Sequence, residues 1–144
     1  MEIIEFSSRA AEYSELSNFY PSPIVMGVVT WPTVEHYFQA QKFPGDSDLQ
    51  SAILSAQTPA AAKKLGRTRS SHFRADWEEV KEMVMLEALQ AKFEQNQNLG
   101  ALLKSTGTAP LKEKAAWDNY WGTGKTGNGR NRMGELLMIV RQGL

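Results

Sequence analysis

A short segment, residues 30–43 with the sequence TWPTVEHYFQAQKF, constrains the fold most, because it sets a strand, a stop and a helix in immediate succession. Trp31 is typical of the end of a strand. Pro32 stops that strand because proline cannot donate a hydrogen bond to a ladder. Thr33 is a favourable N-cap, so the residues after it are predicted to form a helix.

The predicted helix carries polar residues on one face. Glu35, Gln39 and Lys42 follow the spacing i, i+4 and i+7, which places them on the same side of a helix, and His36 flanks them. The apolar residues of this helix point mostly the other way. Periodicity alone favours a solvated polar face on an amphipathic helix. The alternative is that the same face lines a pocket.

Composition restricts the class of protein. The chain has 144 residues, 42% of them hydrophobic and 22% charged, as in a soluble globular domain. It contains no apolar run long enough to cross a membrane, and its N-terminus MEIIEF lacks the basic start of a signal peptide. The absence of cysteine excludes disulfides and thiol nucleophiles and fits a cytoplasmic location.

The same counts argue against a metal or a general nucleic-acid interface. His36 and His72 are the only histidines in the sequence, and no metal-binding spacing occurs. No metal and no organic cofactor is therefore expected. The formal net charge is zero, so general electrostatic binding of nucleic acid is not expected. A zero net charge is compatible with a local basic patch.

Hydrophobic spacing predicts a mainly helical α+β fold. Residues 24–30 are predicted to form a hairpin turning at Met26-Gly27, and an apolar stripe from Trp77 onward predicts a long helix ending near Gln95. No linker divides the chain. We therefore predict a single domain over residues 1–144, with a small antiparallel β ribbon near the N-terminus.

A glycine-rich segment precedes the last predicted helix. Residues 122–127 match GxGxxG, but too few residues follow to build a dinucleotide-binding βαβ unit. A P-loop would need glycine at position 119, which is Asn119. Two interpretations remain. The segment is either a flexible loop whose backbone N–H groups approach an anion or a mobile surface loop.

Three blocks of the sequence together resemble the NADAR, or YbiA-like, family. They are SNFYP, WPTVEHYFQAQKF and DNYWG…GKTGNGRNRMG, and the resemblance runs from about Phe6 to Arg141. Met26 departs from the Asp-Gly that the family often has at the hairpin turn. The resemblance implies an N-glycosidase. Known members cleave phosphoribosylated aminopyrimidine intermediates of riboflavin synthesis, and some remove ADP-ribose from nucleobases, including guanine in DNA.

Cleavage of an N-glycosidic bond passes through an oxocarbenium-like state. Two carboxylates can stabilise its positive charge and direct the attacking water. Glu35 and Asp118 are the predicted pair. Lys42 is a third predicted catalytic residue, which could orient phosphate or hydroxyl groups or form a Schiff base with a ring-opened sugar. Further residues are predicted to bind the substrate: Arg9, Asn18, His36, Gln39, Trp77, Trp121, Gly122 and Asn131.

Several of these residues have ordinary structural explanations. Arg9 is either a surface charge or a phosphate clamp, and Asn18 either caps a turn or contacts a ligand. Trp77 either packs in the core or stacks on a planar base, and Trp121 is predicted to stack on such a base. The competing function is a binding module for ADP-ribose or NAD without turnover. The expected partner is a small phosphoribosyl or ADP-ribosyl molecule, with ADP-ribosylated nucleic acid as a further candidate and no membrane.

Overall fold

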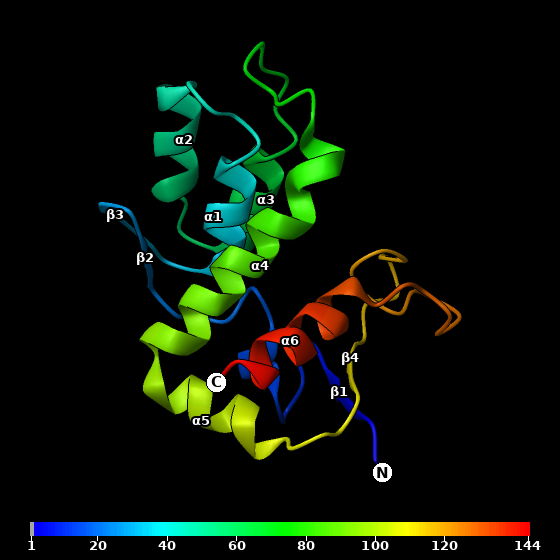
Figure 1. Cartoon of the computed structure of the whole chain (residues 1–144). Coiled ribbons are helices and arrows are strands. Elements are labelled where there is room, and N and C mark those ends of the chain that lie inside the picture. Colours follow the sequence, from blue (N-terminus) through cyan, green and yellow to red (C-terminus); the bar gives the residue numbers. More distant parts are fainter. Residues whose placement is uncertain (1) are drawn as a thin grey trace. The chain divides into compact units, whose positions relative to one another are not determined.

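The computed structural model describes residues 2–144 and is mainly helical with four short strands, as predicted (Figure 1). Within the described chain, residues 2–20 and 96–144 form one compact unit, called unit 1 here, and residues 21–95 form another, unit 2. That residues 1–144 act as a single domain stays a prediction. The elements of unit 2 are β2 (Ile24–Met26), β3 (Val29–Trp31), α1 (Val34–Ala40), α2 (Ser47–Leu54), α3 (Pro59–Leu65) and α4 (Trp77–Gln95).

Unit 1 is built from segments at both ends of the chain. Its helices and strands are β1 (Ile4–Phe6), the 3-10 helix η1 (Ser14–Leu16), α5 (Gln97–Ser105), β4 (Leu111–Glu113) and α6 (Arg132–Gln142). β1 pairs with β4 in parallel, with Ile4 opposite Leu111. This pairing joins two segments far apart in sequence, and the hydrophobic pattern gives no sign of it.

The predicted ribbon is the antiparallel pair of β2 and β3, with Ile24 opposite Trp31. Its turn lies one residue later than predicted, at Gly27-Val28, and Gly27 has a φ of +66°. A positive φ at the first central residue is the pattern of a type II′ hairpin turn, which favours glycine. The Gln95 side chain exchanges two hydrogen bonds with the backbone of Val25, at 2.7 and 2.9 Å, and so occupies part of the exposed edge of β2.

α1 is the central helix of unit 2 and packs against α2, α3 and α4 (Figure 1). Side-chain caps set three of these helices in place. Thr33 accepts from the His36 backbone N–H at 3.1 Å, Asp46 from Leu49 at 3.1 Å and Thr58 from Ala61 at 3.0 Å. The Thr33 cap falls where the sequence predicts it. The core of the unit includes the fully buried side chains Val34, Phe43, Ile53 and Leu89.

In unit 1, α6 packs on β4 and α5 packs on η1. Phe6, Leu103, Leu111 and Leu137 are buried there. No helix in the described part of the chain is both long and apolar enough to cross a membrane.

Candidate active site

Glu35 and Gln39 form a buried polar pair on α1. Only 6% of Glu35 and 4% of Gln39 is exposed, although periodicity alone favours a solvated face here. The Gln39 Nε2 donates to Glu35 Oε2 at 2.6 Å. Burying a carboxylate and an amide is unfavourable unless hydrogen bonds replace water, so this face is not an ordinary polar surface. The interpretation of a solvated face is wrong for these two residues, and their burial favours the pocket-wall alternative.

Lys42 lies in the turn that follows α1, where its backbone N–H donates to the Gln39 carbonyl at 3.3 Å. Its side chain is half-buried, and the ammonium lies 6.0 Å from the centre of the Trp77 ring. Burial lowers the pKa of Lys42, the nearby Glu35 carboxylate opposes that shift, and the charges of Arg67 and Lys63 add to it. Lys42 is therefore less firmly protonated than a surface lysine.

Lys63 and Arg67 bring two further positive charges close to Lys42. Lys63 is on the last turn of α3 and Arg67 follows that helix, at i and i+4. Within residues 2–144, no carboxylate lies at ion-pair distance from Lys42, Lys63 or Arg67. Neither Lys63 nor Arg67 is among the site residues that the sequence predicts. The packing of α3 on α1 could not be seen in the sequence.

His36 is buried and bonded to the chain through both ring nitrogens. Nδ1 lies 2.8 Å from Thr33 Oγ1, and Nε2 lies 3.0 Å from the Ala56 carbonyl oxygen. A carbonyl only accepts, so Nε2 carries a proton, and in the neutral ring Nδ1 then accepts from the threonine hydroxyl. These bonds tie the start of α1 to the segment after α2. They favour a structural role, and contact of His36 with the substrate stays a prediction.

Trp77 is 5% exposed, and its ring centroid lies 5.0 Å from that of Phe38. Packing against α1 therefore takes up most of its ring, and little surface is left on which a base could stack.

Asp118 holds a turn in unit 1. Its Oδ1 accepts from the backbone N–H groups of Tyr120 and Trp121, at 2.9 and 2.8 Å. Oδ2 takes part in neither bond. The Trp121 ring is half-buried and meets the Tyr120 ring edge to face, with centroids 5.0 Å apart.

The glycines of residues 122–134 allow close internal packing. A Cβ at Gly122 would lie 2.9 Å from the Ala115 Cβ, one at Gly129 2.6 Å from the Gly122 oxygen, and one at Gly134 2.0 Å from the Leu111 oxygen. Gly124 has a φ of +70° as well. Within the GxGxxG match, packing inside unit 1 therefore accounts for Gly122 and Gly124, and a positive φ of +83° accounts for Gly127.

Asn131 anchors the start of α6. Its Oδ1 accepts from the Glu113 N–H and its Nδ2 donates to the Leu111 carbonyl, both at 2.9 Å, so the amide binds the backbone of β4. The backbone N–H groups of Arg132 and Met133, the first two of α6, donate to the Tyr120 and Trp121 carbonyls at 3.0 Å. The interpretation as an anion-binding loop requires free backbone N–H groups. These two groups are already hydrogen-bonded.

Two predicted residues lie in the N-terminal part of unit 1. Arg9 is exposed in a turn closed by the Ala10 N–H and the Ser7 carbonyl at 3.2 Å. Asn18 is buried just after η1, with 6% exposed.

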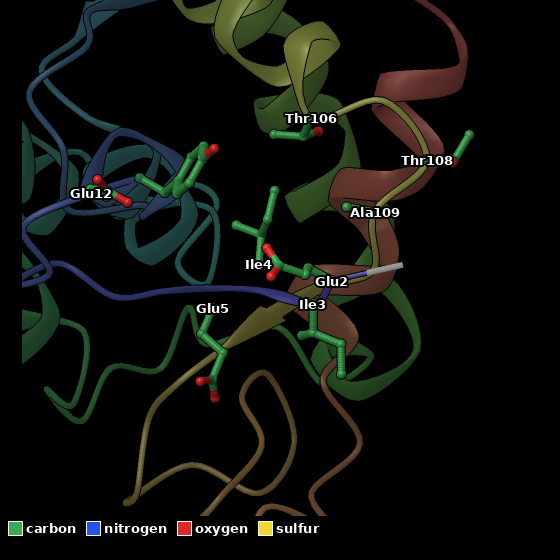
Figure 2. A pocket seen from close by; sticks show the side chains of 9 residues that line it. Glu2, Ile3, Ile4, Glu5, Glu12, Thr106, Thr108 and Ala109 are labelled. Carbon is green, nitrogen blue, oxygen red and sulfur yellow. The ribbon is translucent and has the colours of Figure 1, made fainter.

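A separate cavity of about 540 Å³ in unit 1 is lined by β1, Tyr13 and the segment around Thr106–Ala109 (Figure 2). Three glutamates, Glu2, Glu5 and Glu12, contribute to its lining, and none of the predicted site residues does. Such a lining repels phosphate, so this cavity is a poor candidate for a phosphorylated substrate.

A model of the NADAR domain matches residues 5–144, nearly the whole chain. This chain belongs to the NADAR domain family. The matched range covers residues of both units, α1 and the glycine-rich segment among them.

Relatives of this NADAR chain support the same assignment. It is 49% identical to the N-glycosidase YbiA of Escherichia coli over 99% of this chain and 88% of the relative. It is 40% identical to an N-glycosidase of Nostoc punctiforme, over 90% and 85%. A riboflavin biosynthesis protein of Vibrio vulnificus matches 98% of this chain with 38% of its own length, at 43% identity. The predicted family and the predicted enzyme class, an N-glycosidase, are thus confirmed.

The NADAR fold is confirmed by a solved structure. The NMR structure of E. coli YbiA matches 98% of this chain and 83% of its own, with a TM-score of 0.87 and 48% identity.

Proposed function

We propose that this NADAR protein hydrolyses the N-glycosidic bond of a phosphoribosylated aminopyrimidine. The observation that carries the proposal is the group on α1 and α3. A buried carboxylate, Glu35, lies near a half-buried lysine, Lys42, and two further cations that have no ion-pair partner among residues 2–144. Carboxylate and amine supply the chemistry, and Lys63 and Arg67 suit a phosphate. A relative named for riboflavin biosynthesis supports the choice of base.

Lys42 is the proposed nucleophile. A lysine reacts as the neutral amine, and burial together with neighbouring cations is the known way to favour that form. Both causes lower the pKa of Lys42. In the ring-opened sugar, Nζ adds to C1, and the bond from C1 to the leaving nitrogen breaks as that nitrogen takes a proton. Water then hydrolyses the Schiff base, releasing ribose 5-phosphate and restoring the amine.

Glu35 is the proposed acid–base group for these steps. Its carboxylate accepts a proton as Nζ or water attacks and returns it to the departing nitrogen, and its charge stabilises the cationic sugar. Asp118 is the second proposed carboxylate, acting through Oδ2. The remaining sequence-based assignments, Arg9, Asn18, Trp121, Gly122 and Asn131, are proposed to bind the substrate or shape the site.

The deciding assay compares two substrates. The protein is incubated with a phosphoribosylated aminopyrimidine and, separately, with an oligonucleotide carrying ADP-ribosylated guanine, and released ribose 5-phosphate and ADP-ribose are measured. We expect release from the aminopyrimidine, unchanged by EDTA, because no group of three potential metal ligands occurs in the described residues. Preferential release of ADP-ribose would overturn the substrate assignment. Binding of either compound without release would favour the binding module.

Borohydride trapping tests the role of Lys42. Reduction during turnover should convert a Schiff base into a stable amine, adding the sugar phosphate to one lysine that mass spectrometry identifies. We expect the adduct on Lys42. Lys42→Arg keeps the charge but has no neutral amine, so it should give no adduct and no turnover. Full turnover by Lys42→Arg would instead support direct attack by water.

A further inference from the structure

Gln39 and Gly66 meet in an unusually close contact inside unit 2. Gly66 ends α3, which packs on α1 beside Gln39. A Cβ at Gly66 would lie 1.9 Å from Gln39 Oε1 and 2.7 Å from its Cδ. Any side chain at this position would therefore collide with the Gln39 amide.

The backbone conformation of Gly66 does not itself require glycine. Its φ of −63° and ψ of −9° are ordinary right-handed helical values. A left-handed conformation is the usual reason for a glycine at the end of a helix. That reason does not apply here. The contact with Gln39 is the constraint that the structure shows at this position.

The two polar atoms of the Gln39 amide have different surroundings, and these fix the orientation of the amide. Nε2 donates to Glu35 Oε2 at 2.6 Å, while Oε1 is buried with no hydrogen-bond partner in the described part of the chain. Rotating the amide would set an oxygen against the carboxylate, so the donor must face Glu35. An unpaired buried acceptor costs about 1–3 kcal/mol. Glycine at 66 provides the space in which that orientation is retained.

We propose that Gly66 is a positioning residue for Glu35 and acts through Gln39. The hydrogen bond from Gln39 restricts the Glu35 rotamer. Gln39 then holds the catalytic carboxylate. The sequence predicts a different role for it, in binding the substrate. This role rests on the proposed function, because it assigns Glu35 the chemistry.

Turnover measurements use four variants: Gly66→Ala, Gln39→Ala, the double variant and Gly143→Ala. Gly143 is a matched control because it also ends a helix with right-handed angles, and a Cβ there meets only the Val140 oxygen at 3.6 Å. In the double variant the amide is gone, and the next neighbour of the new methyl group is the Lys63 oxygen at 3.2 Å.

We expect Gly66→Ala and Gln39→Ala each to lower kcat by about tenfold or more, with KM changed by less than about threefold, as for a group that acts on the transition state. Because both act through one contact, the double variant should match Gln39→Ala within about twofold instead of showing the product of the two losses. Gly143→Ala should behave as wild type. Multiplicative losses, or a rise in KM alone, would overturn the positioning role.

A second readout does not need turnover. The Gln39 side-chain amide signal in a ¹⁵N-resolved NMR spectrum, assigned with Gln39→Ala, reports its bond to Glu35. Glu35→Gln and Gly66→Ala should both move it, and Gly143→Ala should not. An unchanged signal in Gly66→Ala would refute the proposal even if wild-type protein cleaves no substrate. A moved signal without any wild-type turnover would instead refute the proposed function and leave the contact intact.

Discussion

The polar face of α1 and the segment 118–134 carry similar residues but use them differently. On α1, the Gln39 side chain donates to the Glu35 side chain, and Lys42 and Lys63 nearby have no carboxylate at ion-pair distance in the described chain. In segment 118–134, Asp118 and Asn131 bind backbone groups. Polar groups bonded to backbone hold the fold, whereas a buried carboxylate beside cations is suited to chemistry.

This contrast changes the weight of the sequence motifs. By periodicity alone α1 is a solvated helix, and the glycine-rich segment is either an anion-binding or a mobile loop. The structure gives other reasons for both, because close packing requires Gly122, Gly129 and Gly134 while burial isolates Glu35 and Gln39 from water. The comparison predicts that charge-removing changes in α1 affect turnover most and that changes in segment 118–134 affect stability most.

The largest expected effect is on Glu35. Glu35→Gln retains the size of the side chain and deletes its charge, so turnover should fall by about a hundredfold or more, the scale of a lost acid–base group. Affinity for an unreactive phosphoribosyl ligand should change by about tenfold at most, or roughly 1.4 kcal/mol. Single-turnover cleavage and calorimetric binding measure the two quantities. Equal losses in both would show that Glu35 only holds the ligand.

Gly134→Ala tests the other side of the comparison. Its Cβ would lie 2.0 Å from the Leu111 carbonyl oxygen and 2.4 Å from Asn131 Nδ2, against groups that form the join between α6 and β4. The backbone must shift, and we expect the free energy of unfolding to fall by about 2–3 kcal/mol, the usual scale for overpacking. Urea denaturation measures it, with Gly143→Ala as the control. A loss below about 0.5 kcal/mol would contradict a packing role for this glycine.

Part of this arrangement could be predicted from sequence because local rules determine it. Thr33, Asp46 and Thr58 begin helices where capping rules place them, and the hairpin follows from Gly27. The family blocks identify the enzyme class. The parallel pairing of β1 with β4 and the contact of Gly66 with Gln39 could not be predicted, because both depend on segments brought together by tertiary packing.

Asp118 has a role on both sides of the comparison. Its carboxylate holds the turn, and we propose that it also acts on the substrate. Asp118→Asn keeps an oxygen for the Tyr120 and Trp121 N–H groups but removes the charge. We expect an unchanged melting temperature and a fall in turnover of about tenfold, less than for Glu35, because one oxygen already serves the turn. Asp118→Ala should in addition lower the melting temperature. Full activity in Asp118→Asn would reduce Asp118 to its turn-holding role.

The smallest expected effect is a gain in stability. The folded-state pKa of Lys42 is lowered, chiefly by burial. The charged lysine therefore lowers the free energy of unfolding at every pH at which it stays protonated in the folded protein. Below the folded pKa this penalty is present in full, and it disappears as pH rises through the folded value towards the unfolded value of about 10.4. Lys42→Met should therefore abolish turnover yet slightly raise the melting temperature at pH 7. That gain should shrink towards pH 10, where wild-type Lys42 loses its charge.

The exposed Lys64, changed to Met, is the matched control and should show no such pH-dependent gain. Thermal denaturation of both variants across this pH range measures the difference. A loss of stability in Lys42→Met at pH 7 would show that the lysine supports the fold, and Lys42 would then belong with the structural groups of segment 118–134.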